Sequence, residues 1–145
     1  MVGSNQGIWI GTDHGGLNKY DAETDSFVHF SDRFMDSVNA QSSAVTAITE
    51  DQFGELWVGT DGDGLSQFNH DSEKFVNYRH NGEDLNSLFV DEVTKIFKDV
   101  IGGIWIGTNG AGLNIHVRER DNFTGYQHHG NSPYSLSHKS CLVNF

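Results

Sequence analysis

Polar side chains able to bind a small ligand occur in two kinds of segment in this 145-residue chain. One kind is a short Gly-rich stretch that follows a Trp-hydrophobic-Gly-Thr run, and the other is a longer polar loop. Asp, Asn, His and Arg side chains suit the hydroxyl groups of a sugar or a carboxylate. The candidate ligand-binding residues are Asp13, His14, Asp61, Asp63 and Asn109 from the Gly-rich stretches, and Arg79, His80, Asn81, Gln127, His128 and His129 from the loops. The alternative is that the Asp and Gly residues at 61–64 only form a turn.

The histidines do not form a recognisable metal-binding motif. Zinc needs three or four convergent ligands, whereas neighbours such as His128 and His129 on an extended segment point apart. His80 holds the position of His128 in its own unit of the chain, which favours a structural role for both. We therefore expect no metal and no cofactor.

Catalysis has no recognisable motif either. Asp61 and Asp63 begin like a calcium loop, but Ser72 stands where the bidentate Glu would be. The same two carboxylates could serve as an acid–base pair, yet their turn gives no reason for a perturbed pKa. The sequence contains no nucleophile elbow and no phosphate loop. We expect this chain not to be an enzyme.

The segments that position these residues repeat every 48 residues. A period of roughly 20–50 residues marks a solenoid, a propeller or an array. Three gapless units fill nearly the whole chain. The matched positions are Trp9/Trp57/Trp105, Gly11/Gly59/Gly107, Thr12/Thr60/Thr108, Gly16/Gly64/Gly112, Leu17/Leu65/Leu113, Phe27/Phe75/Phe123 and Phe30/Tyr78/Tyr126.

One unit contains four predicted strands, at 45–49, 55–60, 65–68 and 74–78, and a loop then leads to the next strand at 93–97. Gly-centred turns join the strands. Four short antiparallel strands in about 40–50 residues is typical of a β-propeller blade. The fold class is therefore all-β, with three blades' worth of four-stranded antiparallel sheets.

The predicted boundaries place the end of a first blade at 7–44, a second blade at 45–92, a third at 93–140 and the first strand of a fourth at 141–145. Trp57 and Gly59 share one face of their strand, since side chains alternate, and a ring beside a glycine suits close packing against a neighbouring sheet. We expect the structural core to contain the recurring aromatic residues Trp9, Trp57, Trp105, Phe27, Phe75 and Phe123.

Three blades cannot close a ring, because propellers use about four to eight. Open ends would expose apolar faces and unpaired strand edges. We expect either an excerpt of a larger propeller or a homo-oligomer. One such oligomer is a two-fold dimer of six blades, in which the last strand of each copy pairs with the first strand of the other.

The chain is acidic, with a formal net charge of −11 and a pI near 4.9. This charge argues against a nucleic-acid partner and against docking on an anionic membrane. Cys141 is the only cysteine, so no intrachain disulfide forms, and its strand position favours a buried small hydrophobic role. No run of about 18 apolar residues and no signal h-region is present. We expect either a cytosolic chain or a piece of a longer exported protein.

Several segments carry a more specific pattern. Residues 51–65 and 103–114 resemble the two-component regulator propeller repeat, which reads roughly D-x-x-G-x-[LI]-W-[IV]-G-T-x-x-G-G-L. Residues 7–20 match it too. The Asn-Ser-Leu lead-in at 86–88 is similar to that of the family, and 134–136 repeats it in part.

The resemblance implies the sensor region of a bacterial membrane signalling protein, periplasmic or otherwise extracytoplasmic, in a membrane-anchored parent. Such propellers often precede a small β-sandwich, a transmembrane helix and a histidine kinase or diguanylate cyclase, and their ligands are often carbohydrate fragments. The chain departs from the family in having only three repeats and no sandwich. We expect a non-catalytic sensor segment that recognises a small carbohydrate or carboxylate. The alternatives are a propeller lyase or hydrolase acting on a polysaccharide or antibiotic, and a purely structural interaction or dimerisation module.

Overall fold

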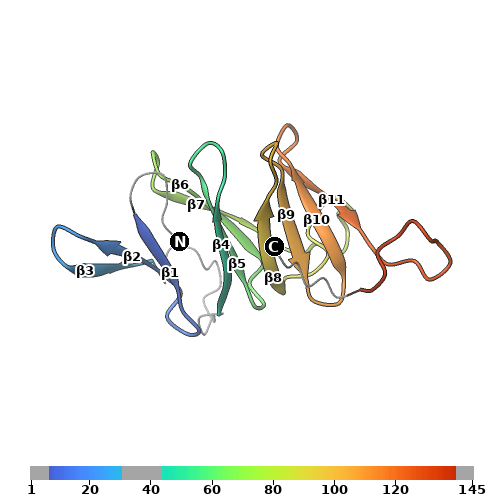
Figure 1. The fold of residues 1–145 in the computed structure, drawn as a ribbon, viewed down its shortest axis with the longest axis horizontal. Coiled ribbons are helices and arrows are strands. Elements are labelled where there is room, and N and C mark those ends of the chain that lie inside the picture. Colours follow the sequence, from blue (N-terminus) through green and yellow to red (C-terminus); the bar gives the residue numbers. More distant parts are fainter. Residues whose placement is uncertain (1–6, 31–43, 140–145) are drawn as a thin grey trace.

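The computed structural model describes residues 7–30 and 44–139, and all of its regular structure in these ranges is β-strand. Three antiparallel sheets lie side by side along the long axis of the molecule (Figure 1). The first sheet contains β1 (Ile8–Gly11), β2 (Leu17–Asp21) and β3 (Ser26–His29). The second contains β4 (Val45–Glu50), β5 (Leu56–Thr60), β6 (Leu65–Asn69) and β7 (Lys74–Tyr78). The third contains β8 (Val93–Lys98), β9 (Ile104–Thr108), β10 (Gly112–Val117) and β11 (Asn122–Tyr126).

Each sheet is a meander in which consecutive strands are hydrogen-bonded neighbours. Strand β8 contacts β4 and β5, and β4 contacts β1, which is the counterpart of β5 in the first sheet, so successive sheets meet along these strands. Fan-like sheets that meet along their inner strands are the arrangement of propeller blades. The all-β propeller fold predicted from the repeat is confirmed. The strand predicted at 141–145, with Cys141, lies outside the described residues.

A recurring aspartate shapes the turn before β5 and the turn before β9. Asp51 Oδ1 accepts hydrogen bonds from the backbone N–H groups of Phe53 (2.8 Å) and Glu55 (3.0 Å), while its Oδ2 accepts from Trp57 Nε1 at 3.2 Å. Asp99 does the same in the third sheet and accepts from Trp105 Nε1 at 2.8 Å. This indole N–H, with nearby backbone N–H groups, lowers the pKa of Asp99. The aspartate therefore holds the turn and orients the indole at once.

The Gly-Thr run after each tryptophan forms a second recurring turn. Thr60 Oγ1 donates to the carbonyl oxygen of Gly64 at 2.9 Å, and Thr108 Oγ1 donates to that of Gly112 at 2.7 Å. Gly64 has a φ of 77°, and a Cβ there would collide with the carbonyl oxygen of Tyr78 on the neighbouring strand. Glycine is required at this position by both its conformation and its space.

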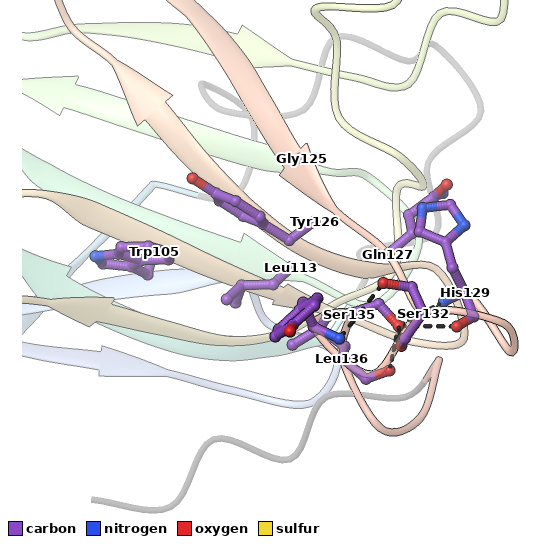
Figure 2. A pocket seen from close by; sticks show the side chains of 10 residues that line it. Trp105, Leu113, Gly125, Tyr126, Gln127, His129, Ser132, Ser135 and Leu136 are labelled. Carbon is purple, nitrogen blue, oxygen red and sulfur yellow. Dashed lines mark hydrogen bonds between the residues drawn. The ribbon is translucent and has the colours of Figure 1, made fainter.

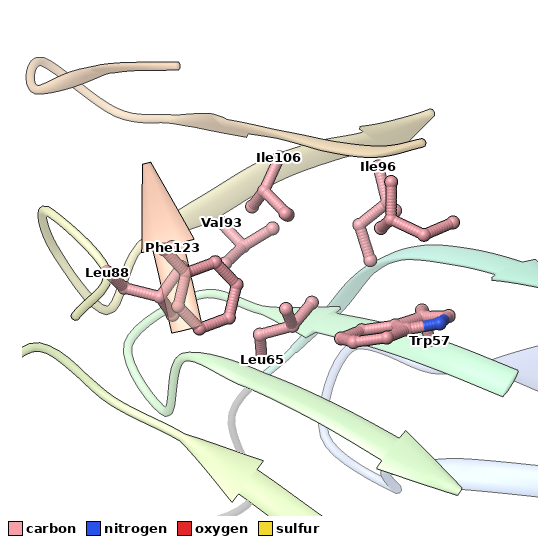
Figure 3. Close-up of a cluster of buried hydrophobic side chains, with 8 residues drawn as sticks. Trp57, Leu65, Leu88, Val93, Ile96, Ile106 and Phe123 are labelled. Atoms are coloured by element: carbon pink, nitrogen blue, oxygen red, sulfur yellow. The ribbon is translucent and has the colours of Figure 1, made fainter. Parts of the chain in front are cut away.

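The core lies between the sheets. Trp57 and Leu65 are fully buried and pack against residues of the third sheet such as Ile106 and Phe123 (Figure 3). A Cβ at Gly59 would lie 2.5 Å from Val93 Cγ1, so the missing side chain is what lets β8 approach β5. The expected close packing beside the tryptophan is therefore present. The matching core between the first and second sheets consists of Trp9, Leu17, Phe30, Leu56, Val58 and Phe68.

The expected aromatic core needs correction at the two ends of the molecule. Trp9, Trp57 and Phe123 are buried and Phe75 is partly buried. Phe27, however, is 50% exposed, and Trp105 is only half-buried. These two rings lie on the outward faces of the first and third sheets, where no further described sheet covers them. Burial therefore depends on a neighbouring sheet as well as on the position in the repeat.

Replacing Trp57 tests this packing. Trp57→Ala should lower the free energy of unfolding by about 3–5 kcal/mol, since it opens a cavity between two sheets. Phe53→Ala is the control, because Phe53 is a large ring that is 58% exposed and should cost much less. Urea unfolding followed by circular dichroism measures both. Equal stability of Trp57→Ala and the unchanged chain would show that the indole is not an inter-sheet core residue.

Candidate ligand-binding face

The Gly-rich hairpins and the long loops meet at one end of the sheets, as the alternating strand direction predicts. The backbone N–H groups of Gly62 (3.2 Å) and Gly64 (2.9 Å) donate to the carbonyl oxygen of Asp91 in the loop before β8. In the next unit, the N–H of Asn109 donates to the carbonyl oxygen of Glu92 at 3.0 Å. We call this end the loop face. Its backbone groups are tied to one another by these hydrogen bonds.

Arg79 and Asp63 form an ion pair on the loop face. Arg79 Nη2 lies 2.6 Å from Asp63 Oδ1, and the side chains are 37% and 12% exposed. Asp63 comes from the hairpin after β5 and Arg79 from the loop after β7. The corresponding residues in the other units are Gly15 and Ala111 for Asp63, and Gln127 for Arg79. The repeat itself therefore does not need this pair.

His80 and His128 have the same bond in successive units. His80 Nδ1 lies 2.8 Å from the carbonyl oxygen of Leu88, and His128 Nδ1 lies 2.6 Å from that of Leu136. Each imidazole closes its own long loop. This agrees with the structural role inferred from their matched positions, and the structure does not bring the two histidines together.

The remaining predicted residues lie at the exposed tips. Asp13 Oδ2 and His14 Nδ1 are 3.2 Å apart, with side chains 82% and 85% exposed. Asn109 Nδ2 donates to Glu92 Oε2 at 3.0 Å. The backbone of Asp61 forms a bridge with Glu92. Asp13 and His14 thus pair with each other, while Asn109 and Asp61 share Glu92 as a partner.

A pocket of about 300 Å³ opens on the same face in the third unit. It lies between the β9–β10 hairpin and the loop after β11, and its side chains include Gln127, His128, His129 and Lys139. Within residues 7–30 and 44–139, no group of three or more His, Cys, Asp or Glu side chains is placed to hold a metal ion.

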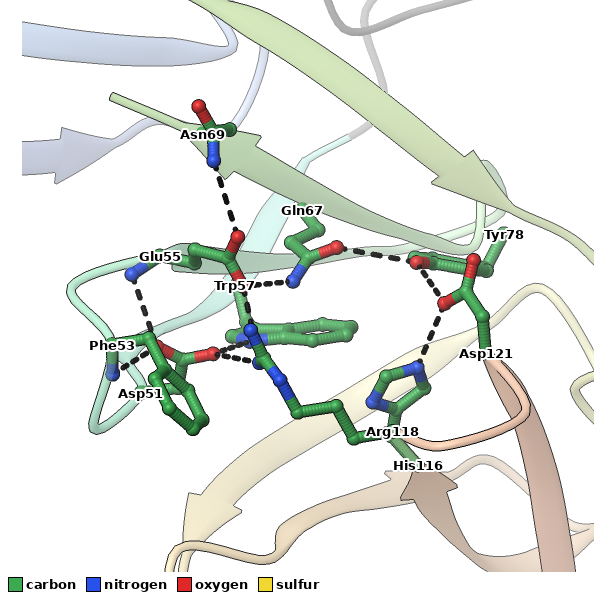
Figure 4. A network of polar contacts seen from close by, with 10 residues as sticks. All are labelled: Asp51, Phe53, Glu55, Trp57, Gln67, Asn69, Tyr78, His116, Arg118 and Asp121. Atoms are coloured by element: carbon green, nitrogen blue, oxygen red, sulfur yellow. Dashed lines mark hydrogen bonds and ion pairs between the residues drawn. The ribbon is translucent and has the colours of Figure 1, made fainter. Parts of the chain in front are cut away.

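A charged clamp that was not predicted from the sequence lies at the opposite end of the second and third sheets (Figure 4). Arg118 Nη1 lies 3.2 Å from Asp51 Oδ2 and 3.2 Å from Glu55 Oε2. Its guanidinium carbon lies 3.8 Å from the centre of the Phe53 ring. The Asp51 side chain is only 2% exposed, so a cation beside it offsets the cost of burying its charge. The clamp joins a turn of one sheet to a turn of the next.

A second polar group lies beside the clamp. The Tyr78 hydroxyl donates to Asp121 Oδ1 at 2.7 Å, and His116 Nε2 lies 3.0 Å from the same oxygen. The His116 ring packs on Trp57, with ring centres 4.8 Å apart. Burial, and then the bond to the Asp121 carboxylate, raise the pKa of Tyr78, while the Tyr78 hydroxyl lowers the pKa of Asp121.

A signal for these residues was present in the repeat. Arg118 replaces His70, and His116 replaces Phe68, at matched positions of consecutive units. A residue that breaks the repeat is not required by the fold of one unit. Its role must be sought in contacts between units or with a ligand.

The fold and its recurring turns define a segment of a β-propeller, and comparison with known proteins gives the type of repeat. The family model of the two component regulator propeller matches residues 39–62. This match confirms the resemblance seen in the sequence for that segment of the chain. No curated protein matches the chain.

Solved structures share the fold over nearly the whole chain. One is the extracellular domain of a protein from B. thetaiotaomicron described as a hybrid two component system, with 23% identity and a TM-score of 0.80 over 97% of this chain and 19% of that one. A second, from the same organism, is the extracellular domain of a protein described as a one component system, with 21% identity and a TM-score of 0.59 over 94% of this chain and 23% of that one. A third is PorZ, a surface component of the type-IX secretion system of Porphyromonas gingivalis, with 16% identity and a TM-score of 0.69 over 97% of this chain and 22% of that one.

The chain thus spans about a fifth of the length of these structures. Identities of this size establish the shared fold. Of the residues that the structure describes, none belongs to a helix able to cross a membrane.

The raised pKa of Tyr78 predicts a loss of stability at alkaline pH. The folded chain retains the phenolic proton at pH values where the unfolded chain loses it, so the stabilisation is present below the ordinary pKa of 10.0 and is lost as pH rises above it. Urea unfolding of the unchanged chain between about pH 8 and about pH 11 should therefore show a marked fall in stability. Tyr78→Phe should reduce this fall, whereas Tyr134→Phe, at a residue 97% exposed, should leave it unchanged. An identical pH dependence in Tyr78→Phe and the unchanged chain would contradict the assignment.

Proposed function

We propose that this chain is a non-catalytic ligand-recognition segment of an extracytoplasmic sensor propeller, in a membrane-anchored parent protein. Its ligand is a small carbohydrate, and a carboxylated sugar suits the loop face best. The match to the two component regulator propeller and the likeness to extracellular domains of proteins described as signalling systems support the sensor role.

The ion pair of Asp63 and Arg79 is the observation that carries the ligand proposal. This pair occurs in one unit only, so the fold of the repeat does not require it. The guanidinium is partly exposed and keeps further N–H donors for an incoming carboxylate, which it can bind through two parallel hydrogen bonds. The carboxylate of Asp63 can accept hydrogen bonds from sugar hydroxyls.

Three carboxyl groups outside the loop face do not fit the role of a catalytic acid. A general acid in a glycosidase needs a carboxyl group with a raised pKa. Asp21, Asp99 and Asp121 have lowered pKa values, because N–H or O–H groups donate to them. These bonds hold turns and contacts between sheets, so they do not describe a catalytic acid.

Calorimetry with a panel of oligosaccharides, with and without uronic acids, tests the proposal. Binding of a uronic-acid oligosaccharide should weaken at least tenfold in Arg79→Ala and partly in Arg79→Lys, since lysine keeps the charge without the planar fork. Arg120→Ala is the matched control, because Arg120 is an exposed arginine in the turn between β10 and β11. Equal binding by Arg79→Ala and Arg120→Ala would refute the site. Turnover of any oligosaccharide would instead support the enzyme alternative.

A further inference from the structure

Each pair of neighbouring sheets in this chain makes the same contact. We call the side of a sheet that faces the next sheet along the chain its far face, and the opposite side its near face. The far face of the second sheet presents Trp57, Leu65, Tyr78 and Leu88, and the near face of the third presents Ile104, Ile106, His116 and Phe123. The far face of the first sheet, with Trp9, Leu17 and Phe30, contacts Leu56, Val58, Phe68 and Phe75 of the second in the same way.

Two faces of this kind remain uncovered among the described residues. The far face of the third sheet presents the matched residues Trp105, Leu113, Tyr126 and Leu136, which line a pocket of about 590 Å³ (Figure 2). The near face of the first sheet presents the matched residues Ile8, Ile10, Tyr20 and Phe27. Of these, Ile8 is 41% exposed, Phe27 50% and Tyr126 48%. Aliphatic and aromatic side chains grouped in this way mark an interaction surface.

The aromatic pairs on both uncovered faces already have the geometry of the buried contact. Trp105 and Tyr126 are stacked with ring centres 5.9 Å apart, as Trp57 and Tyr78 are at 5.8 Å. On the other face, the rings of Tyr20 and Phe27 lie 5.4 Å apart at 51°. The buried pair of His116 and Phe123 lies 5.3 Å apart at 54°. Docking would therefore require little rearrangement of these rings.

A hydrogen bond distinguishes this match from apolar packing alone. In the buried contact, Asp121 accepts from the Tyr78 hydroxyl and is held in place by His116. The matched Asp25 has the same left-handed backbone, with φ of 50° at both residues. The Tyr20 hydroxyl holds Asp25 Oδ1 at 2.8 Å. The acceptor for a second tyrosine is thus already formed on the near face of the first sheet.

We propose that the far face of the third sheet docks on the near face of the first sheet of a second copy of this chain, with the Tyr126 hydroxyl donating to the Asp25 carboxylate of that copy. One copy carries both halves of the contact. Two copies related by a two-fold axis form the contact twice and give a ring of six sheets. Because this contact joins two different faces, the copies form a closed ring only if the rotation that relates them also brings the second pair of faces together.

Sedimentation equilibrium of the whole chain tests the proposal. The unchanged chain should be a reversible dimer. Phe27→Glu should make it monomeric, because a charge would be buried against the docked sheet. Val28→Glu should leave the dimer intact, since Val28 lies on the opposite side of the same strand and is similarly exposed, at 47%. Tyr126→Phe should weaken dimerisation at least tenfold. Asp25→Asn, which tolerates the left-handed turn, should weaken it less and should add little when combined with Tyr126→Phe.

A mixing experiment separates a head-to-tail contact from a symmetric one. Phe27→Glu and Tyr126→Glu should each be monomeric alone, and their mixture should form a dimer held by one intact contact. Circular dichroism and urea unfolding confirm that both variants are folded. A monomeric unchanged chain, equal effects of Phe27→Glu and Val28→Glu, or no association in the mixture would each overturn the proposal. Because these readouts do not involve a ligand, their outcome is independent of the proposed sensing function.

Discussion

The contact between the tryptophan of one sheet and the near face of the next is the constraint on which the whole structure depends. Hydrogen bonds also link the sheets; one of them runs from Thr46 Oγ1 to the carbonyl oxygen of Val93 at 2.6 Å. The close approach itself depends on the burial of the indole, which Asp51 holds in place, and on the absence of a side chain at Gly59, which lets Val93 approach. Stability in such an array is a sum over units and nearest-neighbour contacts. A sheet without a neighbour therefore lacks part of its core, which explains why equivalent aromatic residues are buried in the middle of the molecule and exposed at its ends.

The sequence was sufficient to predict nearly everything that lies within one unit. The 48-residue spacing predicts four strands per unit, and the observed bounds, such as Val45–Glu50 and Lys74–Tyr78, differ from the predicted ones by one residue or none. It succeeded because local rules determine these features: alternation along a strand, and glycine where φ is positive. The burial of Phe27 was predicted wrongly for a related reason. Periodicity shows that a position faces a neighbour, but not whether that neighbour is present.

The candidate site was less accessible from the sequence, because its residues meet between segments that are far apart along the chain, within one unit or across two. Arg79 and Asp63 are separated by a full strand pair, and Arg118 reaches Asp51 in the preceding sheet. A list of polar loop residues mixes such pairs with those that only close a turn, such as His80 with Leu88. Comparing matched positions separates the two classes. Residues that recur with the same bond in each unit belong to the fold, and those that occur once are the ones whose chemistry needs another explanation.

The same comparison indicates how the sheets are kept in order. The contact between the first two sheets is largely aromatic, with His70 packed on Trp9 at the position that Arg118 holds in the next unit. In the second contact, Arg118 needs the carboxylates of Asp51 and Glu55. On the uncovered far face of the third sheet, the position of Glu55 is occupied by Gly103, and the first sheet has the uncharged Ala22 where Arg118 would be. If a sheet with an arginine at the position of Arg118 packed on this far face, the guanidinium would find only one of the two carboxylates that it has in the second contact. The first sheet has no arginine at that position, so it would bury no unpaired charge there. Specificity of this kind comes as much from contacts that a wrong neighbour cannot satisfy as from those that the right one makes.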